Sequence, residues 1–200
     1  MVVDRDVADA FVAVAHRIVW CTVATVDRLG RPRSRVLHPY WEQTEDGLTG
    51  WITTRPTPLK QAHLEHSPYV SCSYWDATQD AVVAECCAGW AEDLDEKEHA
   101  WELFRAVPEP LGHDPYKIWP AGPSDPDAGV LRLDPWRLRV ASLQTLTGRA
   151  PRAHLAGSRC SATPATTSAT PVTSASAGTW PSTAIPIAVA VAGSSETNSA

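Results

Sequence analysis

The chain lacks any long run of apolar residues. No stretch reaches the roughly 18 residues that a membrane-spanning helix needs, so no membrane span is expected. The start of the chain contains Asp4, Arg5, Asp6 and Asp9 and shows no basic segment followed by an apolar run. A secretory signal is therefore not predicted, and we expect a cytoplasmic protein that does not bind a membrane.

Metal, nucleotide and hydrolase motifs are also missing. The five cysteines form no C-x-x-C pair, and Cys and His residues are not clustered as a metal site requires, so no metal is expected. In a cytoplasmic protein we expect reduced thiols. No Walker A, G-x-G-x-x-G or G-x-S-x-G sequence occurs, so a P-loop, a Rossmann site and a serine-hydrolase elbow are not supported.

Positive charge is in deficit, because 17 Lys and Arg residues stand against 23 Asp and Glu residues, for a net charge of -6. This argues against a general nucleic-acid-binding protein. A length of 200 residues allows one ordinary domain with a tail. Near residue 150 the composition changes to Ala, Ser, Thr and Pro with almost no charge. We predict a folded domain over residues 1–150 and a disordered tail over residues 151–200.

The first 150 residues show the patterns of a β-rich α+β domain. Apolar residues at helical spacing predict helices over residues 6–18, 59–67 and about 95–107, the last with Asp95 as its N-cap. Runs rich in β-branched and aromatic residues predict strands over residues 18–26, 33–41, 48–54, 69–75, 81–92, 130–133 and 137–143. We expect six or seven antiparallel strands, closed into a barrel and flanked by short helices.

Two segments carry the residue types of an anion site. Strand alternation places Arg33 and Arg35 on one face, where an anion would relieve their mutual repulsion. The second segment lies where a strand ends and a helix begins, and it contains Thr53, Thr54, Arg55 and Lys60. The alternative for the first segment is a solvated strand face, and the alternative for the second is a capped helix with surface charges. Together the segments predict a phosphate site without a glycine-rich loop.

Three further residues are candidates for contact with a small molecule. Most of the nine tryptophans are expected to pack in the core or a dimer interface, but Trp75 ends a predicted strand and is well placed to stack on a flat ring. His38 and His113 are candidates for lining a pocket, with a structural or exposed histidine as the alternative. No convincing acid–base pair is present, so the catalytic residues are unknown.

The order of these pieces resembles the flavin-binding split β-barrel family typified by pyridoxamine 5'-phosphate oxidase. The resemblance covers roughly residues 6–145. Its motifs are short, and their order is more specific than any one of them. They lie at residues 30–32, 33–37, 52–54, 60, 67–71, 75, 89–92 and 131–138.

The resemblance implies a homodimer with FMN at the interface. Arg35 and Lys60 would contact the flavin phosphate, and Thr53 and Thr54 would offer hydroxyl or backbone contacts nearby. By the same resemblance, Val36 and Leu37, which follow Arg35, would lie along the isoalloxazine ring.

Two positions depart from the oxidase pattern. Leu59 stands where the family has an arginine before the lysine, a role that Arg55 would take here, and Tyr40 stands where the family has a lysine. These departures argue against pyridoxamine phosphate as the substrate. The expected function is that of an FMN-dependent oxidoreductase acting on a small molecule. The alternatives are a reductase of the same superfamily that uses a deazaflavin coenzyme and a non-catalytic flavin-binding protein.

Overall fold

The computed structural model describes residues 5–45, 47–141 and 153–156. Three α-helices occur in this part of the chain: α1 (Arg5–Ile18), α2 (Pro58–His66) and α3 (Leu94–Ala106), with a short 3-10 helix, η1, at Pro115–Lys117. The strands are β1 (Cys21–Val26), β2 (Pro32–Leu37), β3 (Tyr40–Thr44), β4 (Gly47–Thr54), β5 (Tyr69–Trp75), β6 (Ala81–Trp90), β7 (Gly129–Ala141) and β8 (Ala153–Ala156).

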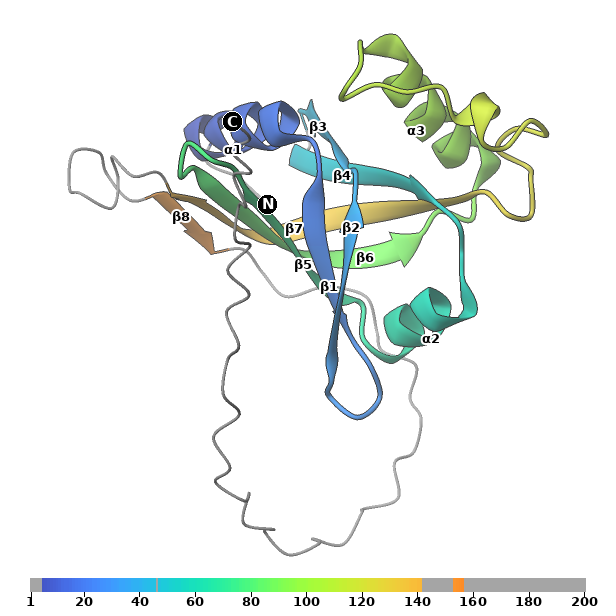
Figure 1. Cartoon of the computed structure of the whole chain (residues 1–200), viewed down its shortest axis with the longest axis horizontal. Helices are drawn as coiled ribbons and strands as arrows, with labels where there is room; N and C mark the ends of the chain where they lie inside the picture. Colours follow the sequence, from blue (N-terminus) through green and yellow to red (C-terminus); the bar gives the residue numbers. More distant parts are fainter. Residues whose placement is uncertain (1–4, 46, 142–152, 157–200) are drawn as a thin grey trace, which may run out of the picture. The chain divides into compact units, whose positions relative to one another are not determined.

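The strands form one antiparallel sheet in the order β2-β1-β5-β6-β7-β4-β3, and β8 pairs with β7 (Figure 1). β7 is the longest strand. On one edge it pairs with β6, and on the other its residues 129–133 pair with β4 and its residues 137–140 with β8. The expected β-rich antiparallel fold with short flanking helices is therefore confirmed.

Prolines account for two differences between the expected and observed strands. The strand expected over residues 33–41 is divided into β2 and β3 at Pro39, because proline donates no hydrogen bond to a strand ladder. The two strands expected around residues 134–136 are instead one continuous strand, β7, because a register shift opposite Glu85 and Cys86 accommodates this segment as a β-bulge.

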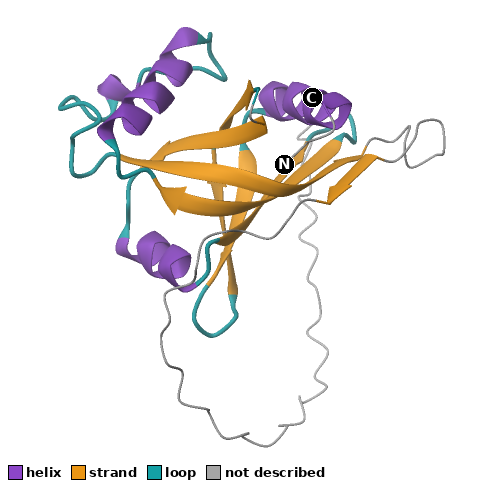
Figure 2. Ribbon diagram, turned by 180° about the vertical axis from the view of Figure 1, so that it is seen from behind, coloured by secondary structure: helices purple, strands orange, loops and turns teal. Residues whose placement is uncertain are grey.

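The main core lies between α1 and the inner face of the sheet. α1 turns Val7, Phe11 and Ala15 toward β6 and β7, and Phe11 meets the ring of Trp41 edge-on at 4.9 Å between centroids. Figure 2 shows α1 against the strands from the opposite side of the molecule. Cys21 and Val23 of β1 belong to the same buried cluster, which anchors the β1–β2 hairpin that carries Arg35.

A second apolar cluster holds α3 against β4. It contains Trp51, Trp101, Phe104 and Trp119, all buried. α3 begins at Asp93, whose side chain accepts a hydrogen bond from the backbone N–H of Asp95 at 3.0 Å. The expectation that Asp95 is the cap is wrong, because the cap is Asp93, two residues earlier, and Asp95 is already helical.

The cysteines differ in environment. Cys21, Cys72 and Cys86 are buried and free, as expected. Cys87 is disulfide-bonded, so the expectation of reduced thiols is wrong at that position. Adjacent residues of a strand point to opposite faces, so the Cys87 sulfur lies on the face away from the thiols of the core.

The predicted tail of residues 151–200 lies outside the described residues except for β8. These four residues form a strand because β4 covers only the first half of β7, which leaves backbone groups of the second half free for pairing. Among the described residues, no helix is both long and apolar enough to cross a bilayer.

Candidate functional site

Lys60 is the centre of a positively charged cluster. It lies on the first turn of α2 and is only 8% exposed, and its Nζ donates to Oγ1 of Thr54 at 2.6 Å. Burial, together with the nearby guanidinium groups of Arg35 and Arg55, lowers the pKa of Lys60 to about 8. A lysine in this setting is held against the repulsion of two neighbouring cations.

Thr25 of β1 orients the side chain of Arg35. Its Nη1 donates to Oγ1 of Thr25 at 2.8 Å, and the same hydroxyl lies 2.9 Å from Nδ1 of His63. Thr25 and His63 are both buried, so this contact has a fixed geometry. Burial lowers the pKa of Arg35, and Arg33 on the same face lowers it further, as the strand alternation predicts.

The cluster carries more positive charge than its surroundings neutralise. Among the described residues, neither Arg35 nor Lys60 forms an ion pair, and Arg55 is paired only through an exposed contact with Asp127 at 3.8 Å. Three neighbouring cations and a threonine hydroxyl match the charge and hydrogen-bonding needs of a phosphate group. We name Arg35, Arg55 and Lys60 the cation cluster.

A cavity of about 430 Å³ lies near the cation cluster. It starts where β2 ends, at Leu37 and His38, and its floor includes Thr53 of β4. Its apolar walls also include Trp20, Pro110 and Ile118. Arg35 and Leu37 are two residues apart on β2, about 7 Å along a strand, and Thr53 precedes Thr54 on β4. Two strands thus connect the cavity with the cation cluster.

His113 and His38 give the cavity its imidazole groups. Nε2 of His113 lies 3.1 Å from Oγ1 of Thr53, and the rings of the two histidines are 5.3 Å apart between centroids. Burial lowers the pKa of His38 to about 4, and burial also lowers the pKa of His113. Both rings are therefore neutral at pH 7.

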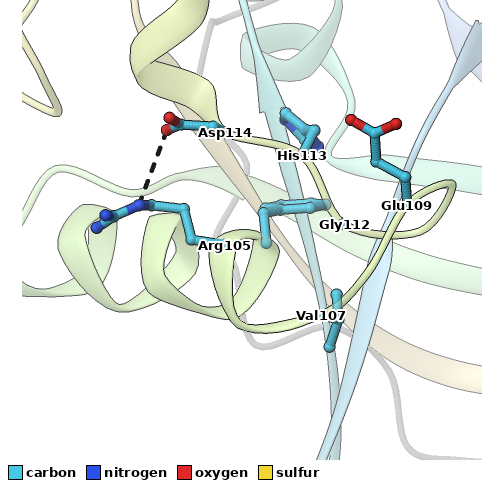
Figure 3. Close-up of a pocket in the computed structure, with 7 residues that line it drawn as sticks. Arg105, Val107, Glu109, Gly112, His113 and Asp114 are labelled. Atoms are coloured by element: carbon cyan, nitrogen blue, oxygen red, sulfur yellow. Dashed lines mark ion pairs between the residues drawn. The ribbon is translucent and has the colours of Figure 1, made fainter.

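The loop after α3 holds His113 in place. Gly112 is required there, because a Cβ at this position would lie 1.7 Å from the carbonyl oxygen of Val107. The backbone N–H of His113 donates to the carbonyl of Phe104 at 3.0 Å. A second cavity of about 260 Å³ borders the same loop, where Glu109 and His113 lie on one side (Figure 3).

Arg105, the cation in the lining of this second cavity, is already paired. Arg105 and Asp114 form an ion pair at 3.8 Å on the far side of the loop from His113 (Figure 3). Its geometry therefore supplies no unpaired cation near His113.

The family model described as Pyridoxamine 5'-phosphate oxidase matches residues 7–141. The chain belongs to this family. Because the match contains β1 through β7, it includes both the cation cluster and the larger cavity.

Solved structures share the fold at low sequence identity. A protein from Clostridium acetobutylicum related to general stress protein 26 of B. subtilis, described as of the pyridoxinephosphate oxidase family, has a TM-score of 0.57 at 15% identity, with 77% of this chain and 96% of that one covered. General stress protein 26 from Bacillus anthracis gives 0.54 at 16%, with 74% and 96% covered. A heme binding protein from Mycobacterium smegmatis gives 0.55 at 18%, with 78% and 60% covered. No curated protein matches the sequence.

The structure brings together most of the residues that the sequence singles out. Arg35, Thr54, Arg55 and Lys60 lie at the cation cluster, and Leu37 and Thr53 lie at the cavity. Thr53 and Thr54 point to opposite faces of β4, which is why the two threonines serve different parts of the site.

Val36 and Trp75 lie elsewhere. Arg35 is opposite Val23 in the β1–β2 register, on the core side, whereas Val36 is opposite Thr22 and faces away from the core. Trp75 also faces away from the core at the end of β5, and both side chains are 64% exposed. Neither side chain lines the larger cavity.

Sequence reasoning missed Thr25 and His63. A threonine in a predicted strand and a histidine in a predicted helix carry no sign of a shared role. The alternation of β1 could have placed Thr25 on the buried face, but only the pairing of β1 with β2 places it beside Arg35.

Proposed function

We propose that this chain binds FMN, with the phosphate on the cation cluster, and acts as an FMN-dependent oxidoreductase on a small molecule. One observation carries the proposal: Lys60 is buried beside Arg35 and Arg55 without an ion pair of its own among the described residues. A dianionic phosphate would offset the repulsion among these three cations. Membership of the pyridoxamine 5'-phosphate oxidase family supports a flavin.

The residues of the site would contact different parts of the flavin. Arg35 and Lys60 would donate charge-assisted hydrogen bonds to the phosphate, with Thr54 and Arg55 beside them. Leu37, two residues from Arg35 on β2, would contact one edge of the ring system and leave the rest of the larger cavity free for a reaction partner. Bound FMN would supply the electron or hydride transfer, while the protein binds and orients both reactants.

The departures of the sequence from the oxidase pattern remain visible in the structure. Leu59 is 52% exposed on the first turn of α2, and Arg55, which lies near Lys60, would provide the charge that the family places there. Tyr40 packs against the ring of His16 at 4.9 Å between centroids. Tyr40 cannot supply the positive charge of the lysine it replaces, which supports a substrate other than pyridoxamine phosphate.

A deazaflavin coenzyme is the second candidate, because its longer anionic tail would extend along the β1–β2 hairpin. Arg28 and Arg33 form no ion pair among the described residues, whereas Arg31 is already paired with Asp27 at 2.7 Å. Arg33 lies near Arg35, and Arg28 lies in the turn of the same hairpin, so these unpaired guanidinium groups favour this candidate over an uncharged ligand. A non-catalytic flavin-binding protein is the third possibility.

We further propose that the protein is a homodimer. The sheet face away from the core carries Val36, Tyr69 and Trp75, all of them large and exposed. Burying such side chains against a second copy would remove apolar area from water. This face includes the reverse side of β2, next to the strand face that carries Arg35.

Titration of the purified protein with FMN, riboflavin and a deazaflavin coenzyme tests the cofactor. Arg35→Ala should weaken FMN binding ten- to a hundredfold, because it removes a charge-assisted hydrogen bond of about 1.5–3 kcal/mol. Riboflavin has no phosphate and should bind equally to both proteins. The matched control is Arg28→Ala, an exposed arginine outside the cation cluster.

Three results would decide against parts of the proposal. Equal losses for FMN and riboflavin in Arg35→Ala would mean that Arg35 acts through the fold. Binding of the deazaflavin coenzyme but not FMN, weakened by Arg28→Ala, would establish the second candidate. Tight FMN binding with no reduction by any tested donor would leave the non-catalytic alternative.

A further inference from the structure

The larger cavity differs from the cation cluster in charge. No arginine or lysine lines it, and Glu109 is the only acidic residue of its lining. The two histidines add no positive charge, because burial lowers the pKa of both rings. An anion placed in this cavity would therefore meet a carboxylate and no cation.

The walls of the cavity suit a flat, apolar molecule. Its volume of about 430 Å³ lies within the usual range of small-molecule sites. Trp20 and Ile118 are each 56% exposed, so a ligand that covers them removes apolar area from water. The indole of Trp20 lies 5.1 Å from the ring of His38 between centroids, which gives a planar ligand aromatic surfaces to contact.

We propose that this cavity binds a planar aromatic small molecule that carries no negative charge. The identification of that molecule as the reaction partner of the flavin rests on the proposed function, whereas its binding does not. Glu109 contributes to this charge preference, which the absence of a cation from the lining also favours. Leu37 and Thr53 place the cavity beside the cation cluster, so that one site has an anion-binding part and an anion-excluding part.

Three probes of nearly equal shape test the charge preference: benzamidine, benzamide and benzoate, which are cationic, neutral and anionic. Binding is followed by NMR from the indole N–H signal of Trp20, assigned with Trp20→Phe. Excess inorganic phosphate is present to occupy the cation cluster, so that benzoate cannot bind there unnoticed. Benzamidine and benzamide should bind, and benzoate should bind at least about tenfold more weakly.

Substitution at Glu109 tests the cause of this preference. Glu109→Gln should reduce the ratio of benzamidine to benzoate affinity by about two- to fivefold, because an exposed carboxylate is partly screened. Glu98→Gln, an exposed glutamate of α3 outside the cavity lining, is the matched control and should leave the ratio unchanged. Both substitutions are on the surface and are not expected to disturb folding.

The possible results separate this inference from the proposed function. Benzoate binding as tightly as benzamide, or no probe perturbing the Trp20 signal, would overturn it. Loss of benzamide binding when the protein is saturated with FMN would show that the cavity holds the flavin ring, which also overturns it. Benzamide binding in a protein that binds no flavin would support the cavity inference while the proposed function fails.

Discussion

FMN affinity should fall steeply above pH 8, because the phosphate needs Lys60 in its charged form. The pKa of Lys60 is lowered to about 8 by burial and by Arg35 and Arg55. A bound phosphate dianion would raise that pKa again, so binding above pH 8 would be accompanied by proton uptake. FMN itself remains dianionic over this range, since the second pKa of a phosphate monoester is about 6.

The size of the effect follows from the protonated fraction of the free protein. With a pKa of about 8, this fraction falls from about three quarters at pH 7.5 to about 3% at pH 9.5. FMN affinity should therefore fall about 25-fold between these two values, provided that the pKa in the complex exceeds 9.5. Fluorescence titration at several pH values measures this directly.

Two controls isolate Lys60 as the cause. Riboflavin affinity should stay nearly constant across the same range, because it lacks the phosphate. Lys60→Arg should flatten the pH profile of FMN binding, because a guanidinium stays charged above pH 12, whereas Lys97→Arg on α3 should leave the profile unchanged. A wild-type FMN profile as flat as that of riboflavin would refute the assignment of Lys60 to the phosphate.

Three further predictions concern the loop, the cavity and the sheet. Gly112→Ala should destabilise the fold by more than about 2 kcal/mol in urea unfolding, because its Cβ would lie 1.7 Å from a backbone oxygen; unchanged stability would contradict the tight approach. The folded-state pKa of His38 is about 4, below the unfolded value of about 6.5. The stability that neutral His38 contributes is therefore lost as the pH falls from about 6.5 toward 4. Between pH 7 and 5 the free energy of unfolding of the wild type should fall by about 1–2 kcal/mol more than that of His38→Gln, which is less than the full pKa shift implies because the ring is only half-buried. His113 and His16 titrate nearby and are retained in both proteins. Trp75→Glu should convert the proposed dimer to a monomer in light scattering, and a monomer mass for the wild-type protein would contradict the proposed dimer.

Local sequence patterns were sufficient for most of the fold. The spacing of Val7, Phe11 and Val14 predicted α1, and period-two alternation correctly put Arg33 and Arg35 on one face of β2. Prolines made strand ends harder to place. Pro39 does mark a strand end, as its residue type suggests, but a new strand, β3, begins directly after it, and Pro135 was tolerated within β7 at a bulge. A bulge depends on the partner strand, which a single segment does not reveal.

For the candidate site, too, some features follow from the sequence and others only from the tertiary structure. The sequence by itself determined the cationic segments, because the residues from Thr53 to Lys60 are joined by a strand end and the first turn of a helix. Only the tertiary structure decided that Thr25 orients Arg35 and that His113 reaches Thr53, sixty residues away. Strand alternation and helix starts are local properties of the backbone, whereas these contacts depend on strand pairing and on how close α3 and its loop approach β4.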